Sequence, residues 1–192
     1  MTIKNKLVLL SFFSNQNLYI PIKVLFFVKY MATYSEISAF KFFFVFAMLF
    51  LEIPSGLLSD KIGNKKIVVA GRTFLIFALL LIILSKNIMG FYVASTLLGI
   101  SASLESGSLN SYQIGLGDKY NFNFSNLMVK IAKYNTIISV LFTITSSFLY
   151  AVSSELPFII TILLLLATWL MIVFGLPSYE KERRKKEEFF SK

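Results

Sequence analysis

The chain has 192 residues, 56% of them hydrophobic, and a formal net charge of +9 at neutral pH. A soluble protein is usually about 45–50% apolar. The excess here is gathered into long runs separated by short charged stretches, a pattern typical of a multi-pass membrane protein. The absence of cysteine and histidine excludes disulfides, Cys/His metal sites and serine–histidine triads. We therefore expect no enzyme activity, no catalytic residue, no metal and no cofactor.

Six apolar runs follow one another along the chain, each long enough to cross about 30 Å of hydrocarbon as a helix. They predict helices over residues 7–29, 37–58, 67–85, 90–108, 130–150 and 156–176. The connections are short except the one over residues 109–129. The sequence therefore predicts an all-α integral membrane domain over residues 1–176 and a charged cytoplasmic tail over residues 177–192.

The first predicted helix carries a polar stripe. Ser11, Asn15, Tyr19 and Lys23 recur every four residues and so share one face, with Gln16 beside them. Polar and ionisable side chains are costly in lipid and usually line a cavity, although Lys23 also lies far enough along the helix to reach the outer surface. Asn15, Gln16, Tyr19 and Lys23 are our candidates for a substrate path.

The other helices differ in polarity. Residues 90–108 carry Ser95, Gly99 and Ser103, a small-xxx-small pattern, and residues 130–150 carry serines and threonines at three- and four-residue steps. We interpret both patterns as helix–helix contact rather than function. The third and sixth helices are apolar nearly all round. That recurrence predicts two three-helix repeats of inverted topology, a common architecture in secondary transporters.

A charged stretch separates the second and third helices. Glu52, Gly56 and Asp60 are four residues apart and share one face. Gly63 suits the tight turn that reverses the chain. We also expect Glu52 to pair with Arg72, because the two lie at comparable depth on adjacent antiparallel helices.

The stretch GLLSDKIGNKK, from Gly56 to Lys66, resembles the loop motif G-x-x-x-D-(R/K)-x-G-(R/K)-(R/K) between helices 2 and 3 of the major facilitator superfamily. The preceding EIPS and the later Ser106-Gly107 resemble its multidrug-efflux-like bacterial branch. In that family the motif's aspartate and basic residues latch two six-helix halves together on the cytoplasmic side. The resemblance implies this role for Asp60, Lys61, Lys65 and Lys66.

The resemblance further implies that this sequence corresponds to an N-terminal six-helix half whose first and fourth helices line a substrate path. Family members usually have twelve spans, so a second half would be needed. The arginine that many proton antiporters carry in helix 4 has no counterpart in residues 90–108. Glu52 and Glu105 are the remaining near-membrane acids on helices 2 and 4.

The basic residues are distributed unequally between the two predicted sides. If the N-terminus is cytoplasmic, fifteen lysines and arginines lie on the cytoplasmic side and three, Lys29, Lys41 and Lys86, lie outside. This positive-inside bias predicts a plasma-membrane protein with both termini in the cytoplasm. It also accounts for the charge of +9, so we expect no nucleic-acid partner.

Three functions remain open from the sequence. The chain is a half-transporter that works as a homodimer or with a separate C-terminal half, an inactive fragment of a longer permease, or a non-transporting membrane partner. The first two predict a secondary-active permease for an unidentified small molecule, with drug-like compounds implied by the resemblance alone. The lipid bilayer is a partner in every case.

Overall fold

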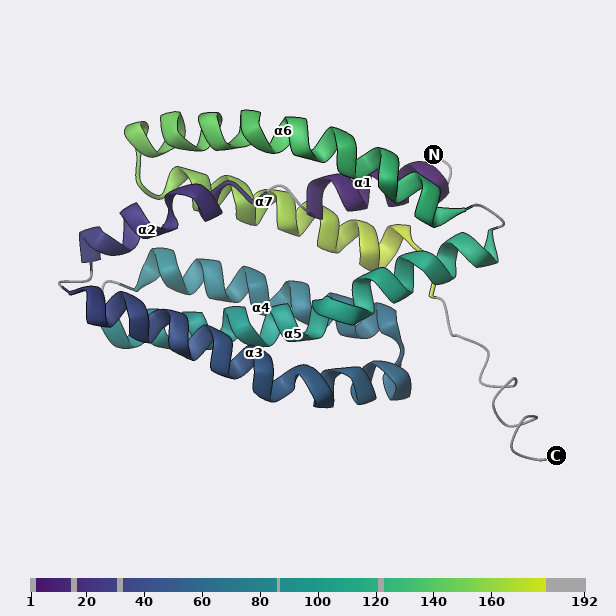
Figure 1. Cartoon of the computed structure of the whole chain (residues 1–192), viewed down its shortest axis with the longest axis horizontal. Coiled ribbons are helices and arrows are strands. Elements are labelled where there is room, and N and C mark those ends of the chain that lie inside the picture. The colour runs from purple at the N-terminus through teal and green to yellow at the C-terminus, as the bar shows by residue number, and fades with distance from the viewer. Residues whose placement is uncertain (1–2, 15–16, 31–32, 86, 121–122, 179–192) are drawn as a thin grey trace.

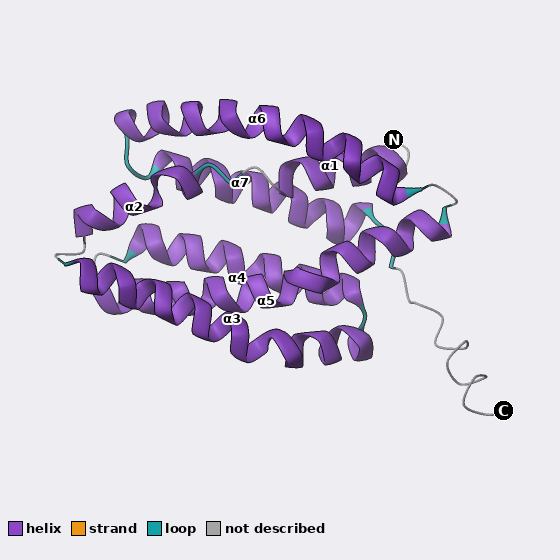
Figure 2. Cartoon of the chain, in the orientation of Figure 1, coloured by secondary structure: helices purple, strands orange, loops and turns teal. Residues whose placement is uncertain are grey.

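The computed structural model describes residues 3–14, 17–30, 33–85, 87–120 and 123–178, and every regular element in them is helical (Figures 1 and 2). The elements are α1 (Ile3–Ser14), α2 (Tyr19–Tyr30), α3 (Tyr34–Ile62), α4 (Asn64–Leu84), α5 (Ile88–Lys119), α6 (Phe124–Val152), α7 (Leu156–Leu170) and the π-helical turn η1 (Met171–Gly175). The all-α part of the predicted fold class is confirmed.

Five of these helical segments are long and apolar enough to cross a membrane: α3, α4, α5, α6 from Asn126 onward, and α7 continued through η1. They indicate a membrane protein. The contacts place α3, α4 and α5 together, and α1, α2, α6 and α7 together, with α4 and α7 joining the two groups. Two inverted three-helix repeats stay a prediction.

The single helix predicted over residues 7–29 is instead two helices, α1 and α2, which are 12 residues long each. Asn17 and Leu18 between them are not helical. Pro21 explains the division, because in a continuous helix its ring would collide with the carbonyl four residues earlier, at Asn17. In the observed structure Pro21 lies in the first turn of α2, where its missing N–H is not needed.

The break after α1 is held by other helices. The Ser146 hydroxyl on α6 donates a 2.5 Å hydrogen bond to the Leu18 carbonyl. On α1, the Ser11 hydroxyl accepts a 3.1 Å bond from the Gln113 amide. A non-helical backbone is tolerated at membrane depth only where such partners satisfy it, so these contacts allow the chain to interrupt its first apolar run.

The predicted long connection over residues 109–129 is wrong. The helix α5 continues to Lys119, and α6 begins at Phe124. The continuation of α5 is anchored at Tyr112, whose hydroxyl donates to the Pro177 carbonyl at 2.8 Å. It belongs to the bundle rather than to a loop.

The pair α3 and α5 pack closely along the small-residue stripe of α5. The Ser95 hydroxyl donates a hydrogen bond to the Phe40 carbonyl. The Ser103 hydroxyl donates one to the Ser55 hydroxyl at 3.1 Å. A Cβ on Gly99 would lie 2.3 Å from the Phe44 carbonyl oxygen. The interpretation of this stripe as a helix–helix contact is confirmed.

The bundle has two buried apolar clusters. The larger contains a group of aromatic rings contributed by α2, α3, α5 and α7: Phe26, Phe27, Phe40, Phe91 and Phe158. The smaller lies around Leu7, Val68 and Tyr112.

Helix α3 contains Pro54 in its interior. The hydroxyl of the next residue, Ser55, donates to the Glu52 carbonyl at 2.9 Å.

Candidate functional site

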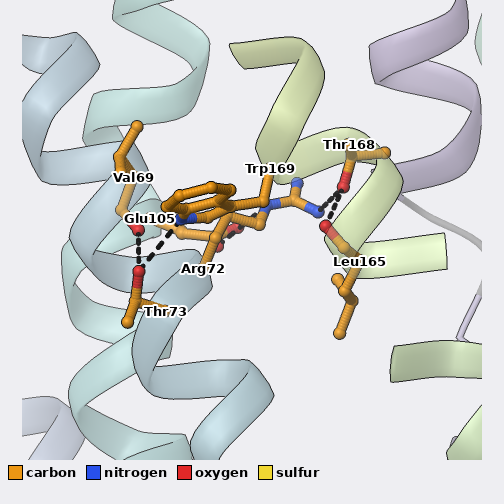
Figure 3. Close-up of polar contacts among 7 residues, drawn as sticks. All are labelled: Val69, Arg72, Thr73, Glu105, Leu165, Thr168 and Trp169. Atoms are coloured by element: carbon orange, nitrogen blue, oxygen red, sulfur yellow. Dashed lines mark hydrogen bonds and ion pairs between the residues drawn. The ribbon is translucent and has the colours of Figure 1, made fainter. Parts of the chain in front are cut away.

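A buried ion pair lies between α4 and α5. Arg72 Nε is 3.0 Å from Glu105 Oε1, and the two side chains are 1% and 18% exposed (Figure 3). The predicted partner of Arg72, Glu52, is exposed on α3. Our assignment of Glu52 to this pair is therefore corrected to Glu105. Both acids lie on helices that contact α4, but α3 is rotated about its axis so that Glu52 faces away from Arg72.

The guanidinium of Arg72 also reaches α7. Its Nη1 donates to the Thr168 hydroxyl at 3.2 Å, and that hydroxyl donates to the Leu165 carbonyl at 2.9 Å (Figure 3). The neighbouring Trp169 indole N–H donates to the Thr73 hydroxyl at 3.0 Å. The sequence predicted that this helix is apolar nearly all round. The adjacent Thr168 and Trp169, the latter the chain's one tryptophan, were the signal that this prediction overlooked.

Gly71 makes room for the ion pair. A Cβ at this position would lie 2.7 Å from Glu105 Cγ and 3.4 Å from the Ser101 carbonyl. The glycine lets α5 bring its carboxylate against α4 beside Arg72. A buried charge is stabilised when it is paired and hydrogen-bonded. Glu105 supplies the opposite charge and Thr168 accepts a hydrogen bond from the guanidinium, whereas Arg72 Nε and Glu105 Oε1 meet as an ion pair without a hydrogen bond.

A cavity of about 280 Å³ lies beside Glu105, and we call it the Tyr19 cavity. Two of the predicted path residues, Tyr19 and Lys23, line it. The other two, Asn15 and Gln16, lie outside the described residues. Lys41 of α3 also lines the cavity, although sequence reasoning placed it only in the outer charge count. Its position inside an apolar run was the available signal.

A second hollow, of about 750 Å³, runs between α3 and α5, and we call it the α3–α5 groove. Glu52, Gly56 and Asp60 all line it, which confirms that they share one face. The opposite wall includes Gly107 and Asp118 of α5. Small side chains on both walls leave the groove wide. Three acidic residues line it: Glu52, Asp60 and Asp118.

The loop motif forms the turn between α3 and α4. Gly63 has φ +93° and is the last cap of one helix and the first of the next. The Ser59 hydroxyl donates to the Asn64 side-chain oxygen, so the residue that replaces the motif's first basic position joins the turn. The motif therefore gives the reversal that the sequence predicted.

The lysines of the motif have different environments. Lys65 donates to the Val173 and Leu176 carbonyls at 3.0 and 2.7 Å, and so binds the end of η1, where carbonyls lack helical partners. Lys61 and Lys66 are exposed. Lys6 of α1 donates to the Gly175 carbonyl at 2.7 Å. Lys6 and Lys65 thus meet at one end of the bundle.

No protein-family model matches the chain, and no curated protein matches it in sequence. Within the described part of the chain, no three histidine, cysteine, aspartate or glutamate residues are grouped so that they could hold a metal ion.

Proposed function

We propose that this chain is the six-helix N-terminal half of a secondary-active permease of the major facilitator type. One observation supports this most strongly: Glu105, which forms a buried ion pair with Arg72, lines a cavity inside a bundle of apolar helices. Ionisable residues at membrane depth usually mark a pathway for a substrate or an ion. The loop from Gly56 to Lys66, with its resemblance to the family motif, is the second support.

The α3–α5 groove supports the proposal that a second half packs against this chain. Small residues at Gly56 and Gly107 would let another helix approach closely. The acids along the groove would face the basic or positive helix-terminal groups of that half. Alternating access then consists of rocking the two halves against each other around the Tyr19 cavity. The second half is a second copy of this chain, a separate chain, or the remainder of a longer permease.

The proposed orientation places both termini in the cytoplasm of a plasma-membrane protein. Lys6 and Lys65 meet at the same end of the bundle as the exposed Lys61 and Lys66. At the other end Lys29 donates to the Ser154 hydroxyl at 3.1 Å. The basic residues thus concentrate at one end, which the positive-inside rule assigns to the cytoplasm.

The test is cross-linking of single cysteines in native membranes, since the chain has no cysteine of its own. Gly56→Cys and Gly107→Cys place a thiol in open space in the groove. Phe50→Cys, on α3 but outside the groove and 72% exposed, is the matched control. We expect disulfide or bis-maleimide products between chains at positions 56 and 107, and none at position 50.

The outcomes separate the alternatives. A cross-linked homodimer would support a working half-transporter. Rapid degradation that a co-expressed six-helix C-terminal half prevents would identify the chain as part of a larger permease. A stable monomer that does not respond to any second half would refute the transport proposal and favour a non-transporting membrane partner.

A further inference from the structure

Two lysines from different helices line the Tyr19 cavity. Lys23 of α2 is half-buried and Lys41 of α3 is exposed, and both line the cavity. Lining one cavity of about 280 Å³ brings their two positive charges to the same small space. Among the described residues neither is in an ion pair, and Lys41 lies 4.9 Å from the centre of the Phe44 ring. A pair of like charges without an acidic partner is costly beside an apolar core, and an anion between them would relieve that cost.

The one acid in the cavity wall is at a different level. The Ser95 hydroxyl bonds the carbonyl of Phe40, so Lys41 lies level with Ser95. Glu105 is ten residues further along α5, or about 15 Å at 1.5 Å per residue. Arg72 neutralises Glu105 through the 3.0 Å contact. Arg72 therefore offsets the one acid in the cavity lining, and Lys23 and Lys41 leave an excess of positive charge there.

Most of the remaining cavity wall is apolar, and much of it is aromatic. Phe27, Phe40 and Phe44 line it together with Leu75 and Leu98. The volume of about 280 Å³ is just below the range for drug-sized small-molecule sites, about 300–1,000 Å³. A small apolar body fits such a space, with its charged group directed at the lysines.

We propose that the Tyr19 cavity binds a small amphipathic organic anion, with its acidic group between Lys23 and Lys41 and its apolar body against Phe27, Phe40 and Phe44. This inference rests on the proposed function only in naming the class of molecule that would be carried. The resemblance to drug permeases implies an amphiphile without specifying its charge. Here the charge is assigned from the two lysines.

The first experiment uses the unmodified protein in an uncharged detergent and titrates three probes of nearly equal shape by calorimetry. They are naphthalene-2-carboxylate, naphthalene-2-carboxamide and 2-naphthylmethylammonium. We expect the carboxylate to bind roughly tenfold or more tightly than the carboxamide, since hydrogen bonds to charged groups are the stronger ones, and the ammonium to bind most weakly. Equal binding of the carboxylate and carboxamide, or a preference for the ammonium, would overturn the proposal.

The second experiment removes each charge. Lys23→Met and Lys41→Met keep an apolar stem of similar length, and each is expected to weaken carboxylate binding roughly tenfold while leaving carboxamide binding unchanged. Lys23→Arg and Lys41→Arg should retain it. Lys29→Met is the control, because Lys29 lies on α2 but outside the cavity. Losses as large for Lys29→Met as for Lys23→Met would show a nonspecific effect of net charge and overturn the proposal.

A phospholipid offers the same chemistry of an anionic head on an apolar body. Nanodiscs of phosphatidylcholine alone and of phosphatidylcholine with phosphatidylglycerol distinguish the sources. Equal naphthalene-2-carboxylate binding in the two kinds of nanodisc supports a small-molecule site. Loss of that binding only in the nanodiscs that contain phosphatidylglycerol would overturn the assignment. Failure of the transport proposal is separate: specific carboxylate binding by a monomer that pairs with no second half would support this inference while refuting transport.

Discussion

Arg72 is the side chain whose loss we expect to destabilise the bundle most, because it is 1% exposed and pairs with the mostly buried carboxylate of Glu105. Arg72→Leu should lower the free energy of unfolding by roughly 3–5 kcal/mol, since it leaves a buried charge without its cation. The double variant Arg72→Leu/Glu105→Gln should recover at least about 1 kcal/mol of that loss. Denaturation in mixed detergent micelles measures both.

Glu52 provides the control for this cycle. Because Glu52 is exposed on α3, Glu52→Gln should change stability by less than about 0.5 kcal/mol. Its effect should also add to that of Arg72→Leu. Coupling of Arg72 to Glu52, or additivity of Arg72 with Glu105, would show that the ion pair is wrongly assigned here.

The sequence indicated that Arg72 needs an acidic partner but not which acid supplies it. Its burial in an apolar run already demands a counter-charge. Glu52 and Glu105 satisfy that demand equally well as long as only helix order and depth are known. The choice depends on how α3 and α5 are rotated about their axes, and Gly71 settles it by admitting Glu105. The contact with Thr168 depends on α7, which is distant in sequence.

Gly63 is the residue whose backbone the loop motif requires. At φ +93° and ψ 141° a side chain is strained, so Gly63→Ala should cost roughly 1–3 kcal/mol of stability. Gly56→Ala is the matched control, because Gly56 is helical and a Cβ there meets nothing within 4 Å. That substitution should be neutral or stabilising by up to about 1 kcal/mol. Thermal unfolding of the two variants in one detergent compares them, and equal losses would contradict the argument.

Among the helices, α3 and α5 make the contact most sensitive to a single methyl group. A Cβ on Gly99 would lie 2.3 Å from a backbone oxygen of α3, whereas one on Gly107 meets nothing within 4 Å. Gly99→Ala should therefore destabilise by roughly 1–3 kcal/mol through overpacking. Gly107→Ala, on the same helix, should not destabilise.

The same unfolding assay tests this pair. A loss of stability for Gly107→Ala as large as that for Gly99→Ala would contradict this argument. A Cβ at position 107 meets nothing within 4 Å, and alanine at a helical position restricts the unfolded chain, which by itself favours the folded state.

At this scale the apolar runs predicted α3, α4, α6 and α7 well, because a span of hydrocarbon sets their length. The apolar runs predicted the wrong helix bounds where a helix is not apolar along its whole length or where an apolar run is not one helix. In the first run Pro21 interrupts the helix without lowering the apolar content. Beyond residue 108, α5 turns polar yet stays helical, since Tyr112 and Gln113 find partners on distant segments. Such contacts are invisible in a local hydropathy pattern.

For the whole molecule the orientation can be tested from the two ends. Lys61→Cys and Lys29→Cys place exposed thiols at opposite ends of the bundle. If the end bearing Lys61 is cytoplasmic, a membrane-impermeant maleimide should label position 29 in intact cells and position 61 only after permeabilisation.

Labelling of both positions from outside would contradict a fixed orientation, and the reversed pattern would contradict the positive-inside assignment. A denatured sample, in which both thiols must react fully, checks that each variant is present in equal amount.

Pro54 gives α3 a mechanical property that the contacts alone do not describe. It has no N–H to offer the carbonyl of Phe50, so the hydrogen-bond ladder of α3 lacks one rung, and a helix bends most easily at such a point. The segment before Pro54 carries Lys41 and lines the Tyr19 cavity, whereas the segment after it carries Asp60 and, with Glu52, lines the α3–α5 groove. Helix α3 thus consists of two regular segments joined at a point where bending is easiest. A movement of the helix at the cavity is expected to bend it at Pro54 rather than to shift the wall of the groove.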